Sequence, residues 1–417
     1  MSGRRDARRH ERGIVLILVL VVIAAMIMAV TAFQRRAMID TTVSANRLDA
    51  AEADALARGG LRLAEVLLVV VRAKQAADSA GATGGENPLG GSEGGDGAAA
   101  LAGLGGGGEG GAVEALWQGI GNVPIELGDG RRLRVAIEDE GAKLNLNALV
   151  PPAAQAAPDT AALDSSDGDD ETADRAREAD DASDSGEETS ASEEAVEYLT
   201  EVLQHVIDGM PQDASTRAYD AKSIAENILD FMDGDGSAIN GRSEDEYYRR
   251  QDPPYRAWNQ PLVSVDQLAL VEDIDAPLLD ELRKYVTVHP IGATTGINLN
   301  RATPWVLKLV YAGSSGDRRL IGDRLVEDIY ALRDKNQLAC SNEGGDPRCV
   351  GLSEIGNGDL GNGEIYPPVQ LPATPAVFKV TASATVGGIE RRFEAIYDTR
   401  TDPGPQLLSW RRLRGND

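Results

Sequence analysis

Residues Ile14–Phe33 read IVLILVLVVIAAMIMAVTAF, an uncharged apolar run that directly follows the arginine-rich segment MSGRRDARRHERG. Roughly 20 apolar residues in a helix are enough to cross the hydrocarbon core of a bilayer. Because the arginines precede the run, we expect the N-terminus to stay in the cytoplasm and the rest of the chain to be exported. A cleavable secretory signal has a shorter apolar core followed by a small-x-small site, and this run has neither. The run therefore predicts a single-pass membrane anchor.

No proline occurs before Pro88, so we predict that the helix of the anchor continues beyond the membrane. At 1.5 Å per residue, a helix from about Ile14 to Ala76 would be roughly 90 Å long, with Gly59-Gly60 as a point where it can bend. We expect its second half to pack on an exported domain through apolar residues at helical spacing. These residues are Leu48, Ala51, Ala55, Leu63, Val66 and Val70.

The overall composition limits how much of the chain can form a packed core and which partners it can bind. It has 417 residues with 46 glycines and 4% aromatic residues, so part of its length lies outside any packed core. The formal net charge of −26 argues against a nucleic-acid partner, because contact with phosphates requires clustered Lys and Arg.

Composition and periodicity divide the chain into segments. One stretch is rich in glycine and another is acidic, and neither can bury enough apolar surface to order itself. The patterns AVEYLTEVLQHVI, SIAENILDFM, SVDQLALV and DAPLLDELRKYV predict helices. The predicted segments are a leader (1–13), a transmembrane segment (14–33), the exported part of the long helix (34–76), a Gly-rich flexible loop (77–112), the first part of an αβ domain (113–150), an acidic disordered insertion (151–194), a helical insertion domain with a helix-hairpin-helix-like part (195–335) and the C-terminal strands of the αβ domain (336–417).

The strands of the predicted sheet are separated in the sequence. Arg131–Glu138 alternates apolar and polar residues, as a half-buried strand does. Near the C-terminus, VFKVTASATV and IERRFEAIYDTR flank Gly387-Gly388, which suits the primed turn of a hairpin. We therefore predict an α+β fold, with a long N-terminal transmembrane helix packed on a small antiparallel sheet and a large α-helical insertion domain.

The start of the anchor resembles the signal of type IV prepilin-like proteins, in which a basic leader ends in Gly and an apolar helix begins at once. In that family a prepilin peptidase cuts after the Gly, which implies cleavage between Gly13 and Ile14 and methylation of the new N-terminus at Ile14. The family usually has Glu at the fifth mature position, where this chain has Leu18. That Glu pairs with a neighbour's ammonium group in the apolar fibre core, so a subunit without it suits a position with neighbours on one side only. An ordinary single-span anchor is the alternative.

Further segments resemble the K-type minor pseudopilin of bacterial type II secretion systems: IEDEGAKLNLNAL, ILDFMDGDGSAINGRSEDEYY, PYRAWNQPLVSVDQLALV and INLNRATPWVLKLV. The resemblance implies a pilin-like αβ domain with a helical insert, and a non-enzymatic role at the pseudopilus tip in the export of folded proteins. It implies an inner-membrane location with the C-terminal domain in the periplasm. The implied partners are I- and J-type minor pseudopilins, the major pseudopilin, the prepilin peptidase and inner-membrane lipid. A minor pilin of a type IV pilus and a membrane-tethered hydrolase stay open as alternatives.

A loop in the second of these segments has the spacing of a calcium site. Its oxygen donors, counted from Asp233, fall at the first, third, fifth, seventh and twelfth positions that a calcium loop uses. Ala238 replaces the usual Gly and no amphipathic exit helix follows, so we do not predict an EF-hand. The K-family resemblance also implies structural calcium, and a metal-free turn is the alternative. The candidate ligands are Asp233, Asp235, Ser237, the Ile239 carbonyl, Glu244 and the additional donor Asp245.

The two cysteines, Cys340 and Cys349, are spaced for one local disulfide, which would require an oxidising compartment. Two reduced thiols are the alternative. Glu343, Asp346 and Glu354 are close enough in sequence to join a metal site, but a plain cross-linked loop is the simpler interpretation.

The sequence carries no convincing catalytic constellation. Gly90–Gly94 matches a nucleophile-elbow pattern and Gly105–Gly110 a dinucleotide pattern, but both lie in the Gly-rich stretch without a strand–turn–helix context. The histidines, His10, His205 and His289, have no evident catalytic partner.

INLNRATPWVLKLV also resembles the opening of a helix-hairpin-helix unit, which in other proteins holds a nucleic-acid backbone. The chain is acidic around it, so we interpret Asn298 and Asn300 as turn and N-cap residues.

Overall fold

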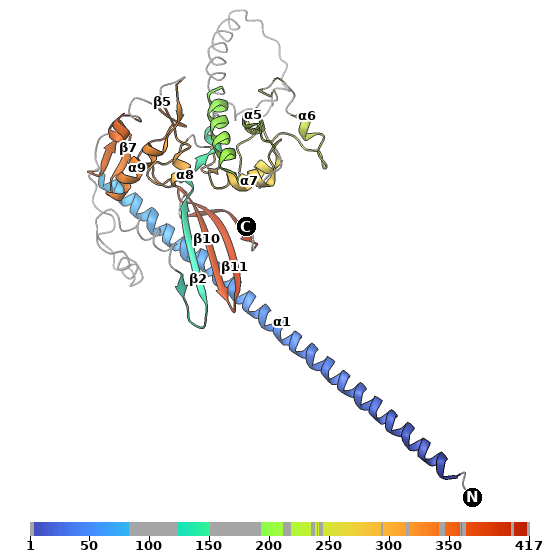
Figure 1. The fold of residues 1–417 in the computed structure, drawn as a ribbon. Helices are drawn as coiled ribbons and strands as arrows, with labels where there is room; N and C mark the ends of the chain where they lie inside the picture. The colour runs from blue at the N-terminus through green and yellow to red at the C-terminus, as the bar shows by residue number, and fades with distance from the viewer. Residues whose placement is uncertain are drawn as a thin grey trace, which may run out of the picture.

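One helix, α1 (Arg4–Ala82), sets the shape of the molecule (Figure 1). Its 79 residues run without interruption, so Gly59-Gly60 does not break it. At 1.5 Å per residue the helix is about 120 Å long. Its N-terminal half extends alone and its C-terminal half lies along the sheet (Figure 1). The computed structural model describes residues 4–82, 124–150, 193–211, 218–234, 238–239, 241, 245–292, 295–313, 317–341, 347–358, 360, 364–401 and 404–414.

A single antiparallel sheet supports α1, in the order β1-β2-β10-β11-β12. In its centre Val380 lies opposite Ile137 on one side and Ala395 on the other. The hairpin predicted around Gly387-Gly388 is confirmed, and both glycines have positive φ (57° and 82°), as a type I′ turn requires. The strands are β1 (Ile125–Glu126), β2 (Arg132–Asp139), β10 (Val377–Val386), β11 (Ile389–Asp398) and β12 (Gln406–Leu413).

The core between α1 and the sheet combines small and large apolar residues from both the helix and the strands. Gly60 sets the closest approach, since a Cβ there would lie 3.0 Å from Leu133 Cδ1 and 3.1 Å from Val135 Cγ2. A Cβ on Gly59 would meet nothing within 4 Å. The buried helix residues are Ala57, Leu61, Ala64, Leu67, Leu68 and Val71, and the strands contribute Leu133, Val135, Ile137, Phe378, Val380, Ala382, Ala384, Phe393, Ala395 and Tyr397.

The residues between β2 and β10 form a second body with its own core, which we call the insert lobe (Figure 1). Its centre holds Tyr198, whose ring lies 5.1 Å from that of Tyr311 and whose hydroxyl donates to Leu309 O at 2.8 Å. Its helices are residues 193–209, α5 (Ala221–Met232), α6 (Asp245–Tyr248), α7 (Ala276–Leu282), α8 (Pro304–Leu307) and α9 (Asp323–Asp334). Its 3₁₀ turns are η1 (Glu140–Ala142), η2 (Leu146–Ala148), η3 (Val265–Leu270) and η4 (Leu352–Gly358).

The insert lobe also contains short strands that the sequence did not predict. They are the parallel pair β3 (Leu144–Asn145) and β4 (Val286–Thr287), the set β6 (Arg319–Leu320), β5 (Tyr311–Gly313) and β9 (Glu364–Tyr366), and the parallel pair β7 (Leu338–Cys340) and β8 (Cys349–Gly351).

Three expectations differ from the structure. SVDQLALV forms a 3₁₀ turn, η3, because the repeat is too short to add a second α-helical turn. The helix-hairpin-helix-like part is not formed as predicted, since strand β5 follows α8 where a second helix was expected. The range 336–417 supplies more than sheet strands, because Ile355, Leu360 and Leu371 are buried in the core of the insert lobe.

Candidate functional site

Helix α1 has two apolar faces. The sheet covers the face opposite to the one that we predicted from the sequence. The predicted packing stripe is wrong, because Leu48, Leu63 and Val66 are 69%, 37% and 53% exposed. The sheet instead packs against the opposite face, where small residues such as Ala57 and Ala64 allow close approach. Helical spacing identifies both faces but not which one the chain covers itself. We call the predicted set the outer stripe, in which all residues but the half-buried Val70 are exposed: Leu48, Ala51, Ala55, Leu63, Val66 and Val70.

The N-terminal part of α1 is the one helix among the described residues that is long and apolar enough to cross a membrane. Its large side chains contact no other part of the protein, and Leu16 and Phe33 are 68% and 74% exposed. Gly13 and Ile14 lie within this helix. The apolar anchor predicted at 14–33 is thus an isolated helical segment, which is the form that a lipid environment requires.

A buried charged network joins the sheet to the insert lobe at the end of β2. Glu140 is 4% exposed and accepts a hydrogen bond from the Thr287 hydroxyl, on β4. Lys143 Nζ lies 3.5 Å from Glu140 Oε1. On the neighbouring strand β10, Lys379 Nζ lies 2.7 Å from Glu138 Oε2. The network therefore ties three separate segments of the chain together.

Burial and the neighbouring ammonium groups set opposite protonation states for two adjacent acids. Burial raises the pKa of Asp139 to about 7, so it is largely protonated below neutral pH. Burial also acts to raise the pKa of Glu140, but Lys143, Lys379 and the Thr287 hydroxyl outweigh it and the pKa falls below its usual value. Glu140 therefore carries the negative charge of the network.

Two asparagines that follow Glu140 hold the loops of the insert lobe. The Asn147 side chain accepts from Leu262 N at 2.8 Å and donates to Leu262 O at 2.9 Å and to Val288 O at 2.7 Å. Asn145 Nδ2 donates to Pro290 O at 3.0 Å. The sequence analysis missed these roles, although the polar positions in KLNLNAL directly after a strand were a signal for them.

Arg411 connects the last strand to the insert lobe on the other side of a groove of about 340 Å³. Its Nη1 lies 2.8 Å from Asp266 Oδ2, and its Nε lies 2.9 Å from Glu394 Oε1. The groove is lined by Lys143, His289 and Lys379 as well, so it is bordered by the buried network. Burial lowers the pKa of His289, which favours its neutral form there.

The candidate calcium loop is described only in part. Asp235, Ser237 and Glu244 lie outside the described residues. Asp233 caps the end of α5, and Asp230 on that helix accepts a hydrogen bond from Ile239 N at 2.9 Å. Asp245 Oδ2 lies 2.7 Å from Arg249 Nη2. No group of three or more His, Cys, Asp or Glu side chains suited to a metal occurs within the described ranges.

Cys340 and Cys349 are joined by a disulfide with Cα atoms 5.5 Å apart. The bond links β7 to β8, so it closes the loop between two parallel strands. Glu343 and Asp346 lie in the part of that loop outside the described residues, and Glu354 is exposed on η4.

Asn298 and Asn300 were predicted to be turn and N-cap residues, and the structure confirms only the turn residue. Asn298 Oδ1 accepts from Asn300 N at 3.1 Å, as a turn residue does. Asn300 is not an N-cap, because α8 begins after Thr303. Its side chain instead accepts from Ala339 N at 2.8 Å and donates to Ala339 O at 2.9 Å, which fixes β7 against this turn.

The strings Gly90–Gly94 and Gly105–Gly110 lie outside the described residues. His205 lies on helix 193–209. Partial burial lowers its pKa, and the positive charge of Lys308 lowers it further.

The helix, the sheet and the insert lobe together define the class of this protein. A long N-terminal helix with a free apolar half, packed by its other half on an antiparallel sheet, is a pilin-like α+β architecture. Residues 142–291 match the model of the family described as type II secretion system (T2SS), protein K. This confirms the resemblance to the K family, over the segment that carries Lys143, Asn145, Asn147 and the candidate calcium loop.

Two relatives named type II secretion system protein K are similar to parts of the chain. The protein from Klebsiella pneumoniae is 28% identical over 110 residues, 26% of this chain and 32% of the relative. The protein from Aeromonas hydrophila is 32% identical over 95 residues, 22% of this chain and 28% of the relative. The matched stretches thus span less than a third of each relative. The GspK-GspI-GspJ complex from the enterotoxigenic Escherichia coli type 2 secretion system aligns with a TM-score of 0.40 at 17% identity, covering 70% of this chain and 83% of that chain.

Proposed function

We propose that this protein is a non-enzymatic minor pseudopilin that occupies the tip of a type II secretion pseudopilus. It is anchored in the inner membrane by α1, with its N-terminus in the cytoplasm and its sheet and insert lobe in the periplasm. It assembles there with I- and J-type minor pseudopilins and the major pseudopilin, and the assembly takes part in exporting folded proteins across the outer membrane. The match to the K family favours this function over that of a type IV minor pilin.

The outer stripe is the observation that supports an assembly role. It continues the apolar surface of the anchor along α1 at steps of three or four residues, with one step of eight from Ala55 to Leu63, and this spacing lets one helix pack on another. Leu48 and Val66 are 69% and 53% exposed although the same helix buries its opposite face. Contiguous exposed apolar surface of this kind marks an interaction site.

Val66→Asp should abolish co-purification with the I- and J-type partners, because an unpaired carboxylate would be buried between two helices. The measurement is pull-down of the full-length chain from detergent extracts of cells that express all three proteins. Ala331→Asp, an equivalent change at an exposed position of α9, is the matched control and should leave assembly intact. Equal recovery of the partners with both variants would rule out assembly through the outer stripe.

Processing by a prepilin peptidase belongs to the same proposal. We expect the mature protein to lack its first thirteen residues and to carry one methyl group on Ile14, since a basic leader ends at Gly13. N-terminal mass spectrometry of the protein from native membranes measures both. A chain that keeps its arginine leader in a host with an active prepilin peptidase would contradict the assignment.

Calcium would have a structural role in the insert lobe. Asp233 at the end of α5 and the turn at Ile239, which Asp230 holds, bring two of the candidate donors to one loop. The Ile239 N–H is engaged, and its carbonyl is the donor that a calcium loop takes from its seventh position. Asp245 is already paired with Arg249, so it is the least suited of the proposed ligands. The bound ion would supply positive charge among carboxylates that otherwise repel one another.

Calcium at about 100 times its dissociation constant should stabilise the folded chain by about 2.7 kcal/mol relative to a chelator-treated sample. Thermal unfolding with calcium and with EDTA measures this difference, which Asp233→Ala combined with Asp235→Ala should remove. Glu246→Ala, which changes a carboxylate on the exposed side of α6, is the control and should retain the full shift. Identical melting temperatures with calcium and with EDTA would exclude the site.

A further inference from the structure

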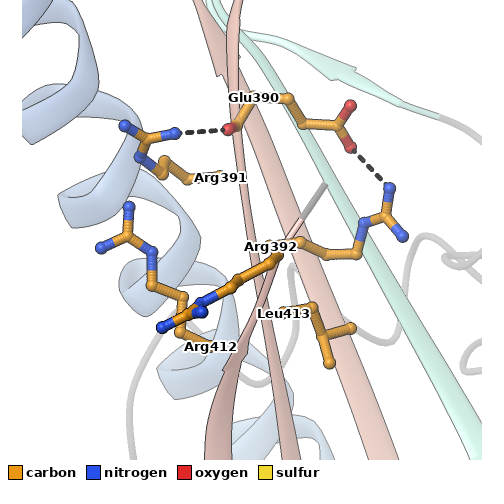
Figure 2. Close-up of a pocket in the computed structure, with 6 residues that line it drawn as sticks. Glu390, Arg391, Arg392, Arg412 and Leu413 are labelled. Carbon is orange, nitrogen blue, oxygen red and sulfur yellow. Dashed lines mark hydrogen bonds and ion pairs between the residues drawn. The ribbon is translucent and has the colours of Figure 1, made fainter. Parts of the chain in front are cut away.

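Five arginines gather where α1 meets the C-terminal edge of the sheet, and we call them the arginine cluster. They line two adjoining hollows of about 500 Å³ and about 410 Å³, which share Arg391 and Arg412. Figure 2 shows these two side chains extending from β11 and β12 toward the helix. The members are Arg58, Arg391, Arg392, Arg412 and Arg414.

The cluster has more positive than negative charge. The residues that line the two hollows carry five guanidinium groups and two carboxylates, Glu390 and Asp54. Asp54 is shared, with its oxygens 2.8 Å from Arg58 Nη2 and 3.6 Å from Arg412 Nη2. In a chain of net charge −26, a local surplus of this sign is a specific surface for an acidic group.

Two guanidinium groups of the cluster, those of Arg58 and Arg391, are held in place by neighbouring groups. The Arg58 guanidinium lies 5.5 Å from the centre of the Phe393 ring, and the Phe393 ring lies 5.7 Å from the Trp410 ring. Arg391 donates from Nη1 to the Glu390 carbonyl at 3.1 Å (Figure 2), while its Nε is buried with no hydrogen-bond partner among the described residues. A guanidinium has five N–H donors and binds carboxylates in a bidentate geometry. Fixed arginines beside an exposed tryptophan are typical of the energetic centre of an interface.

The cluster borders the outer stripe. Ala51 and Ala55 belong to that stripe and also line the second hollow. Their small side chains let another helix approach α1 closely, so a helix on the outer stripe would pass directly beside Arg58, Arg391 and Arg412. Asp54 lies 21 residues beyond Phe33, which is roughly 30 Å along an upright helix, too far for lipid headgroups to reach.

We infer that the arginine cluster binds carboxylates on the helix of a partner subunit that packs along the outer stripe. This inference rests on the proposed function and adds the chemistry of the partner. The partner helix carries an apolar seam for the stripe, flanked by Asp or Glu side chains at the level of Arg391 and Arg412. Apolar packing supplies the general contact, and the carboxylate–arginine pairs fix the axial register and the identity of the partner.

The test measures binding of the full-length chain to its I-type and J-type partners in detergent micelles as a function of salt. Arg391→Gln with Arg412→Gln should weaken binding about tenfold or more at low salt and flatten the salt dependence, because screened ion pairs are lost. Arg391→Lys with Arg412→Lys, which keeps the charges but not the bidentate geometry, should give an intermediate affinity. Arg324→Gln, at an exposed position of α9, is the control for the loss of a positive charge.

The outcomes separate this inference from the proposed function. If Val66→Asp abolishes binding while the double Gln variant binds as tightly as the wild type, the arginine cluster is not the contact although the stripe is. If phosphatidylglycerol vesicles compete with the partner for the cluster, its ligand is a lipid headgroup and the inference is overturned. Weakened binding of the double Gln variant with an unchanged melting temperature supports it.

Discussion

Gly60→Leu should destabilise the folded chain by about 3 kcal/mol, the upper end of the cost of inserting methylenes into a packed core. A Cβ at this position would already lie 3.0 Å from Leu133 Cδ1, 3.1 Å from Val135 Cγ2 and 3.2 Å from Ala382 Cβ. These three side chains come from β2 and β10 and are themselves buried, so they have no space to move into. The helix would have to lift off the sheet to accommodate a leucine.

Gly59→Leu is the matched control, because a Cβ there meets nothing within 4 Å. It should be neutral or stabilising by up to about 1 kcal/mol, since leucine has the better helix propensity. Gly60→Ala should fall between the two, with a gain in propensity that opposes the close contacts. Urea unfolding followed by circular dichroism gives all three values. Equal stabilities for the Gly59 and Gly60 leucine variants would mean that α1 does not pack on the sheet as described.

The parts of the fold that could be predicted from the sequence are those with a long repeating pattern. The anchor, the strand near Arg131–Glu138 and the hairpin around Gly387-Gly388 all lie where they were expected. The short strands inside the insert lobe could not be predicted, because two or three residues carry no period. The pairing partner of Asn145 on β3, Thr287 on β4, also lies more than a hundred residues away in the sequence.

The face of α1 that packs on the sheet was predicted wrongly for a related reason. Both faces of the helix carry leucine, valine and alanine, so hydrophobicity alone does not show which side the sheet covers. Close approach of a helix to a sheet is set by small side chains, and Gly60 was the signal that identified the packed face. The sequence does not predict the buried network, because the charges of IEDEGAKLNLNAL pair with Thr287 and Lys379, which are far away in the sequence.

Glu140→Gln should destabilise the protein by about 3 kcal/mol at pH 7, because removing one partner of a buried ion pair leaves the other charge uncompensated. Glu140 is 4% exposed, and the Lys143 side chain beside it is 15% exposed. Glutamine keeps the shape and can still accept from Thr287, so the loss reports the charge. Glu138→Gln is the control, since that carboxylate is 53% exposed and its loss leaves Lys379 near Glu140. The control should cost no more than about 1 kcal/mol.

The pH dependence of this difference tests the electrostatic cause. The pKa of folded Glu140 lies below the ordinary value of 4.5, so its contribution is fully present above that pH and is lost as the pH falls through the folded value. The gap between the wild type and Glu140→Gln should therefore narrow as the pH falls toward 3. Asp139 has the opposite effect, because its raised pKa weakens the fold as the pH rises toward 7, and Glu140 contributes to that rise. A gap that stays unchanged down to pH 3 would show that the Glu140 side chain acts through its shape and hydrogen bonds, and that its charge does not hold the sheet to the insert lobe.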